Sequence, residues 1–162
     1  MFLRNLLAAG LLAATAPALA ADTNVIDPTH AQVEFTYSHF GFSNITGRFD
    51  RIEGSIVHDA EDPANSSVQA SIAIDSVSTG VADLDEHLRG SDFFDAGSHP
   101  VATFQSTAVK AVGEGRLEVT GDLSIHGVTQ PVVMDVNINK IATHPMTGKP
   151  AAGFDASFRI LR

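Results

Sequence analysis

The stretch VTGDLSIHGVTQPVVMDV, residues 119–136, decides the fold because it contains two alternating strands and the turn between them. Up to Ile125, every second residue is apolar or glycine and the residues between are polar, which is the pattern of a half-buried strand. His126 and Gly127 interrupt this pattern, and we interpret them as a hairpin turn rather than a ligand contact. Beyond them, one face of a second run is apolar: Val132, Met134, Val136 and Ile138.

The same alternation continues in both directions along the chain. It predicts seven strands, over residues 31–39, 45–56, 68–74, 101–110, 115–126, 131–141 and 154–160. A phase change at Asp50 and Arg51 predicts a bulge in the second of them. The pattern breaks down around residues 80–98, where residues 82–88 predict a short helix. The predicted fold class is therefore all-β, an antiparallel up-and-down barrel with a helix and loop insertion.

The two ends of the chain lead to further expectations. Residues 1–20 have the form of a signal peptide, with Arg4 ahead of an apolar run and a small-residue cleavage site at 18–20. We therefore expect export to a bacterial periplasm as a soluble protein, and one barrel domain over residues 21–162. Because the alternation is still intact at Arg162, we expect a final strand to be missing and the domain to be C-terminally incomplete.

Composition excludes several classes of partner. The net charge is −9, and it becomes −10 when Arg4 leaves with the signal peptide, because 9 basic residues then face 19 acidic ones. This negative field repels phosphate backbones and anionic membrane surfaces, so we expect no nucleic-acid partner and no stable membrane insertion. The chain has no cysteine, so the fold does without disulfides.

The sequence contains no motif for catalysis. A Cys nucleophile and a Gly-x-Ser-x-Gly elbow are both absent, so we predict no catalytic residues and no enzymatic activity. Seven histidines are present, without His-x-His or HExxH spacing, so we predict no metal site and no cofactor. Histidines brought together in space by different strands are the alternative that spacing leaves open.

Four motifs in one order resemble the YceI-like family of bacterial lipocalin-like, polyisoprenoid-binding proteins. They are DPTH at 27–30, HLRGSDFFDAGSHPVATF at 87–104, VTGDLSIHGVTQPV at 119–132 and GFDASFRILR at 153–162. The resemblance implies an eight-stranded barrel whose elongated apolar interior holds a long isoprenoid chain, often in a homodimer. The family usually continues past the last of these motifs with a turn and closing strands.

The resemblance implies that the ligand is an isoprenoid lipid of quinone or polyprenyl phosphate type. Candidate ligand-binding residues inside the barrel are Phe35, Phe49, Phe104, Met134, Phe154 and Phe158. Tyr37 and His39 are expected near a polar mouth, under a lid made by Leu84, Leu88, Phe93 and Phe94.

A packed barrel without ligand is the alternative, since buried aromatic residues most often serve core packing. The protein would then be a stress-related structural or interaction protein. Small inward residues favour a cavity, because they leave room along the barrel axis: Gly47, Gly54, Ala70, Gly121 and Ala156.

Overall fold

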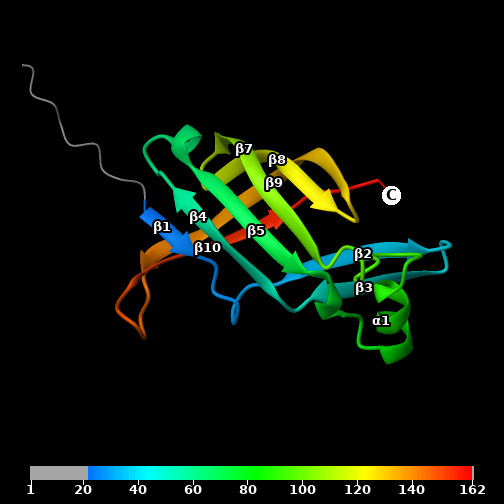
Figure 1. The fold of residues 1–162 in the computed structure, drawn as a ribbon. Helices are drawn as coiled ribbons and strands as arrows, with labels where there is room; N and C mark the ends of the chain where they lie inside the picture. The colour runs from blue at the N-terminus through cyan, green and yellow to red at the C-terminus, as the bar shows by residue number, and fades with distance from the viewer. Residues whose placement is uncertain (1–21, 162) are drawn as a thin grey trace, which may run out of the picture.

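The computed structural model describes residues 22–161, and these form an antiparallel β fold with one α-helix, as predicted (Figure 1). A seven-stranded sheet contains β1 (Asp22–Val25), β4 (Ile52–His58), β5 (Ser67–Ala73), β7 (Val101–Gly113), β8 (Arg116–Ile125), β9 (Val128–Thr143) and β10 (Pro150–Ser157), in that order. A three-stranded sheet contains β2 (Val33–His39), β3 (Ser43–Phe49) and β6 (Val77–Ser78). The predicted helix is α1 (Ala82–Arg89), and short 3-10 turns occupy Pro63–Asn65 and Ile74–Ser76.

The large sheet follows the predicted up-and-down order and curls into a nearly closed barrel. From β4 to β10, each strand pairs antiparallel with the next strand of that sheet along the chain. The curl brings the two ends of the strand order together. The ring of His58 on β4, next to the edge strand β1, lies 5.8 Å from that of Phe154 on the edge strand β10. No helix in the described part of the chain is long and apolar enough to span a bilayer.

The hairpin predicted over residues 119–136 is confirmed. Strands β8 and β9 pair from Ile125 with Val128 through Val119 with Met134 and beyond. The two-residue turn has φ of 53° at His126 and 73° at Gly127. Positive φ at both positions is the mirror-image turn whose twist matches that of the flanking strands.

The bulge predicted at Asp50 and Arg51 is wrong. Strand β3 ends at Phe49 in the small sheet, and β4 begins at Ile52 in the large one. At this crossing, the Asp50 N–H donates to the Ser76 carbonyl oxygen at 3.2 Å, and the Arg51 N–H donates to Ser76 Oγ at 3.1 Å. The phase change in the sequence therefore marks a move between sheets. The short strands β1 and β6 were not predicted, because four and two residues are too few to display an alternation.

The last strand ends earlier than predicted. Strand β10 stops at Ser157, which pairs with Asp135, and the described chain then leaves the sheet. Phe158 is 43% exposed, so the prediction that it continues the strand with an inward side chain is wrong. Alternation describes which side chains share a face, but pairing hydrogen bonds decide where a strand ends.

Two groups of buried side chains make the core. The sheet core lies inside the curl and consists of Phe104, Val109, Leu117, Val119, Leu123 and Val136. The helix core joins α1 and the small sheet to the large sheet and consists of Phe49, Ile74, Val77, Leu88 and Ala102. Figure 1 shows α1 beside β2 and β3 at one end of the molecule. Ile125 packs against both cores, at the point where they meet.

Candidate functional site

An apolar cavity of about 100 Å³ lies within the sheet core. Its walls come from β4, β5, β7, β8, β9 and β10, so it runs across the inside of the curled sheet. The lining residues are Ile56, Val57, His58, Ser66, Val68, Phe104, Val109, Leu117, Val119, Met134, Val136, Phe154 and Ala156. This lining suits a hydrocarbon, because an alkyl chain placed there would leave water without losing hydrogen bonds.

A seam between β4 and β10 forms one side of this cavity. Both strands contribute lining residues, with Val57 and His58 on β4 and Phe154 and Ala156 on β10. The edge strands of the large sheet are β1, which pairs with β4, and β10, which pairs with β9. No backbone ladder among the described strands joins β10 to β1 or β4, so side-chain contacts such as that of His58 with Phe154 close the seam. Separating the two strands would break packing contacts and leave the backbone pairing intact.

The structure divides the predicted ligand-binding residues between the two cores. Phe104, Met134 and Phe154 line the cavity. Six others belong to the helix core or pack against it: Phe35, Phe49, Leu84, Leu88, Phe93 and Phe94. The expectation that Phe35 and Phe49 share one interior with Phe104, Met134 and Phe154 is therefore wrong, because the small sheet gives β2 and β3 a core of their own.

The predicted lid residues are packed against the small sheet. The ring of Phe94 lies 5.9 Å from that of Phe35 and 5.3 Å from that of Phe49, both edge to face. Such aromatic pairs stabilise beyond the area they bury. Tyr37 stacks on Phe35 at 6.4 Å, and His39 is exposed and contacts Phe40 at 4.7 Å. Neither Tyr37 nor His39 belongs to the cavity lining.

Two of the small inward residues accommodate phenylalanine rings rather than a ligand. A Cβ added to Gly47 would lie 2.4 Å from Cζ of Phe35, and one added to Gly121 would lie 2.4 Å from Cζ of Phe104. Each glycine therefore leaves room for a ring from the adjacent strand. The expectation that Gly47 and Gly121 leave room along the barrel axis is therefore wrong, because phenylalanine rings fill the space beside both glycines.

Most of the lining residues that sequence reasoning missed are aliphatic. Val68, Leu117, Val119 and Val136 fell on the inward alternation of their strands, but nothing distinguished them from ordinary core. Val109 is out of phase with Phe104, because an irregularity between Ser106 and Ala108 shifts the register of β7. Alternation along the strands was the better guide to the cavity lining, because most of the predicted phenylalanines belong to the helix core or pack against it.

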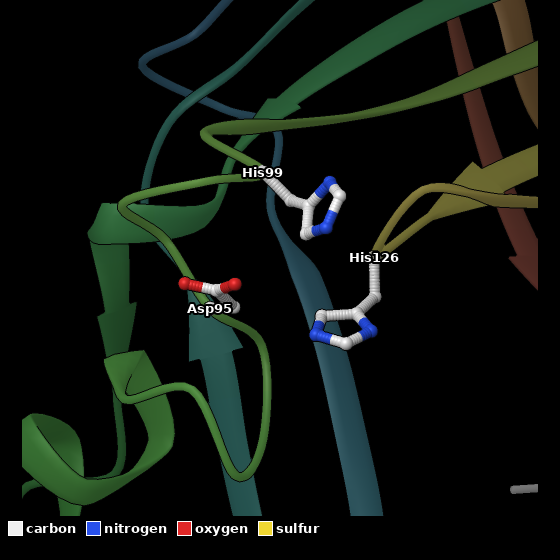
Figure 2. Close-up of side chains that lie close together, drawn as sticks. All are labelled: Asp95, His99 and His126. Atoms are coloured by element: carbon white, nitrogen blue, oxygen red, sulfur yellow. The ribbon is translucent and has the colours of Figure 1, made fainter.

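A second cluster of polar side chains lies outside the cavity. One ligand atom each of Asp95, His99 and His126 lies within 4.8 Å of the other two (Figure 2). Asp95 and His99 come from the segment between α1 and β7, and His126 comes from the β8–β9 turn. The spacing rules for metal ligands missed this group because the β7–β8 hairpin separates His99 from His126 along the chain. We call these three residues the His-Asp cluster.

A curled antiparallel sheet around an apolar cavity, with a helix packed at one end, defines a small lipocalin-like β-barrel protein. A model of the YceI-like domain family matches residues 25–162. A UPF0312 protein of Vibrio parahaemolyticus is 38% identical over 161 residues, which cover 97% of this chain and 85% of that protein. A UPF0312 protein of Photorhabdus laumondii is 39% identical over 159 residues, covering 98% of this chain and 82% of that protein. The chain belongs to the YceI-like family.

Solved structures agree with this assignment. The crystal structure of Burkholderia cenocepacia BcnA superposes with a TM-score of 0.69 at 27% identity, covering 73% of this chain and 74% of that one. The YceI protein of Campylobacter jejuni superposes with a TM-score of 0.65 at 31% identity, covering 80% of this chain and 75% of that one. The curled sheet is therefore a fold that its relatives share.

Proposed function

We propose that this protein binds a long-chain isoprenoid lipid, of quinone or polyprenyl phosphate type, inside the curled sheet. The observation that carries the proposal is the apolar cavity along the β4–β10 seam. Membership of the YceI-like family supports the choice of an isoprenoid. The role is one of binding rather than catalysis.

The cavity has to widen to hold such a ligand. Its volume of about 100 Å³ is below the roughly 300–1,000 Å³ of small-molecule pockets. Burial of a dozen CH2 groups stabilises a complex by about 10 kcal/mol, at ~0.8 kcal/mol each. This exceeds the roughly 3–5 kcal/mol that loss of one buried phenylalanine costs a core. Burial of a long isoprenoid chain therefore releases enough free energy to displace Phe154 at the seam. A short hydrocarbon would bury too few CH2 groups to offset that cost.

The cellular setting and the oligomeric state belong to the same proposal. Residues 1–20, proposed as the signal peptide, lie outside the described residues. We propose cleavage after Ala20 and a periplasmic mature protein, which an intact mass beginning at Ala21 would support. We also propose a homodimer, for which light scattering on the purified protein is the measurement.

Native mass spectrometry followed by organic extraction tests lipid binding. Protein exported to a bacterial periplasm and purified without detergent should carry a species that fragments as an isoprenoid. Ala156→Phe puts a ring into the seam and should reduce lipid retention at least tenfold. Ser157→Phe is the matched control, because the neighbouring side chain of a strand faces the other way. Equal retention in both variants would argue against the cavity as the binding site.

An interaction protein with a packed core is the second candidate. Phe40 and Phe42, at the tip of the β2–β3 hairpin, are 84% and 91% exposed, and exposed aromatic side chains are common at binding surfaces. A protein that stays bare after incubation with quinones and polyprenyl phosphates would favour this role. Phe40→Ser with Phe42→Ser would then abolish partner binding and leave the free energy of unfolding unchanged.

A further inference from the structure

The His-Asp cluster joins two segments that are distant in sequence. Asp95 and His99 lie in the segment that follows α1, and His126 lies at the first position of the β8–β9 turn (Figure 2). Within residues 22–161 it is the one group of three or more potential metal ligands whose ligand atoms come this close. Its neighbours in sequence belong to the cores, since Phe94 and Ala96 pack against the helix core and Ile125 packs against both.

Local hydrogen bonds and close packing position these side chains. The N–H groups of Ser98 and His99 donate to the Asp95 carbonyl oxygen at 3.1 and 2.8 Å. The Ser98 N–H also donates to Asp95 Oδ1 at 3.3 Å. The His99 ring rests on Gly127, where a Cβ would lie 2.7 Å from the ring Cε1. Glycine therefore allows His99 to approach the turn that carries His126.

The geometry is close to that of a metal site. The rings of His99 and His126 have centroids 4.8 Å apart and planes at 55°. Three atoms within 4.8 Å of one another have a common centre no more than about 2.8 Å from each, by plane geometry. Zinc lies roughly 2.0–2.2 Å from nitrogen and oxygen ligands, so each ligand atom has to move inward by no more than about 0.8 Å. His126 is exposed on a turn, where such a movement disturbs little packing.

The ligand types decide which ion fits. Imidazole suits Zn²⁺, Cu²⁺, Ni²⁺ and Fe²⁺, whereas Mg²⁺ and Ca²⁺ prefer all-oxygen sites. Asp95 adds a carboxylate oxygen, which Zn²⁺ accepts beside imidazole nitrogen. The net charge of −9 also favours a cation.

We propose that Asp95, His99 and His126 bind one divalent transition-metal ion, with water completing its coordination. The bound ion would tie the segment after α1 to the β8–β9 turn, at the point where the sheet core and the helix core meet. This inference is independent of lipid binding, since none of the three residues lines the cavity.

Isothermal titration of chelator-treated protein with Zn²⁺ tests the site. We expect one ion per chain. Mutation of a residue that only hydrogen-bonds to a metal ligand typically lowers metal affinity by about 10–100-fold. Replacement of a ligand itself, in Asp95→Asn or His126→Asn, should therefore weaken Zn²⁺ binding at least tenfold. Both substitutions suit the fold, because Asp95 and His126 have φ of 47° and 53° and asparagine tolerates this region. His39→Asn, at an exposed histidine on the β2–β3 hairpin, is the matched control and should bind as wild type.

Histidine ring ¹H–¹⁵N spectra provide the second readout, and they do not depend on how well a variant folds. Added Zn²⁺ should shift the ring resonances of His99 and His126 in the wild-type protein and leave that of His39 in place. The proposal is overturned if the wild-type protein binds no Zn²⁺, if His126→Asn binds it as well as wild type, or if His39→Asn loses as much affinity as His126→Asn.

Discussion

The sheet core and the helix core are both apolar, yet they are built differently. In the helix core, Phe35, Phe49 and Phe94 form mutual ring contacts at 5.3 to 5.9 Å, and the helix covers them. The sheet core is mostly aliphatic, contains the cavity, and is closed along β4 and β10 by side chains. We infer that the helix core stabilises one end of the molecule, whereas the sheet core is the region that can open for a ligand.

Removal of a large side chain from each core should separate these roles most strongly. Phe49 is buried in the helix core, so Phe49→Ala is expected to lower the free energy of unfolding by about 3–5 kcal/mol. Its lipid retention should stay at the wild-type level under conditions where the variant remains folded. Equilibrium urea unfolding followed by circular dichroism measures the first effect, and native mass spectrometry the second.

Phe154→Ala is the corresponding change in the sheet core. Phe154 is only half-buried, so we expect a loss of about 1–2 kcal/mol, below that of a fully buried phenylalanine. Because the ring lines the cavity, the affinity for a polyprenyl phosphate should change at least tenfold. If Phe49→Ala and Phe154→Ala altered stability and affinity in the same proportion, the distinction between the cores would fail.

The glycines beneath phenylalanine rings provide a matched pair of smaller changes. Gly47→Ala should push against Phe35 and Gly121→Ala against Phe104, and overpacking of this kind costs about 1–3 kcal/mol. Only Gly121→Ala should also weaken lipid binding, because Phe104 lines the cavity. Lipid titration of both variants distinguishes the outcomes, and weaker binding by Gly47→Ala alone would reverse our assignment.

The smallest expected effect concerns the turn between β1 and β2, which connects the two sheets. Hydrogen bonds from the Thr29 hydroxyl at 2.7 Å and then from the His30 ring lower the pKa of Asp27 to about 2. Because the folded-state pKa is below its ordinary value of 3.8, the ionised carboxylate stabilises the fold above that value. This contribution is lost as the pH falls from about 4 to about 2.

Thr29→Val tests this turn, because it removes the hydroxyl and keeps a similar shape. The pKa of Asp27 should rise, as followed by NMR titration of its carboxyl carbon, and the variant should lose less stability than wild type between those pH values. An unchanged pKa would show that the hydroxyl does not set it.

Sequence periodicity predicted the sheet better than the site. The hairpin at His126 and Gly127 and the helix at 82–88 were predictable, because turn chemistry and apolar spacing are local properties. Division of β3 and β4 between two sheets was not, since hydrogen bonds from Asp50 and Arg51 to Ser76 are long-range contacts.

The distribution of aromatic residues shows why the site was harder to predict. Phe49 and Phe104 have the same local pattern in sequence and are equally buried, yet one packs in the helix core and the other lines the cavity. Only the sheet topology separates them. The His-Asp cluster was hidden for the same reason, because His99 and His126 meet through the return of the β7–β8 hairpin.

The location of the lipid is the central claim, and methionine methyl NMR tests it most directly. The chain has three methionines, of which Met134 lines the cavity and Met146 is 87% exposed in the β9–β10 loop. When protein with ¹³C-methyl methionine is titrated with a polyprenyl phosphate, the Met134 methyl should shift and show nuclear Overhauser contacts to the isoprenoid methyl groups, while Met146 stays in place. Binding of the lipid with an unchanged Met134 methyl would contradict a site inside the curled sheet.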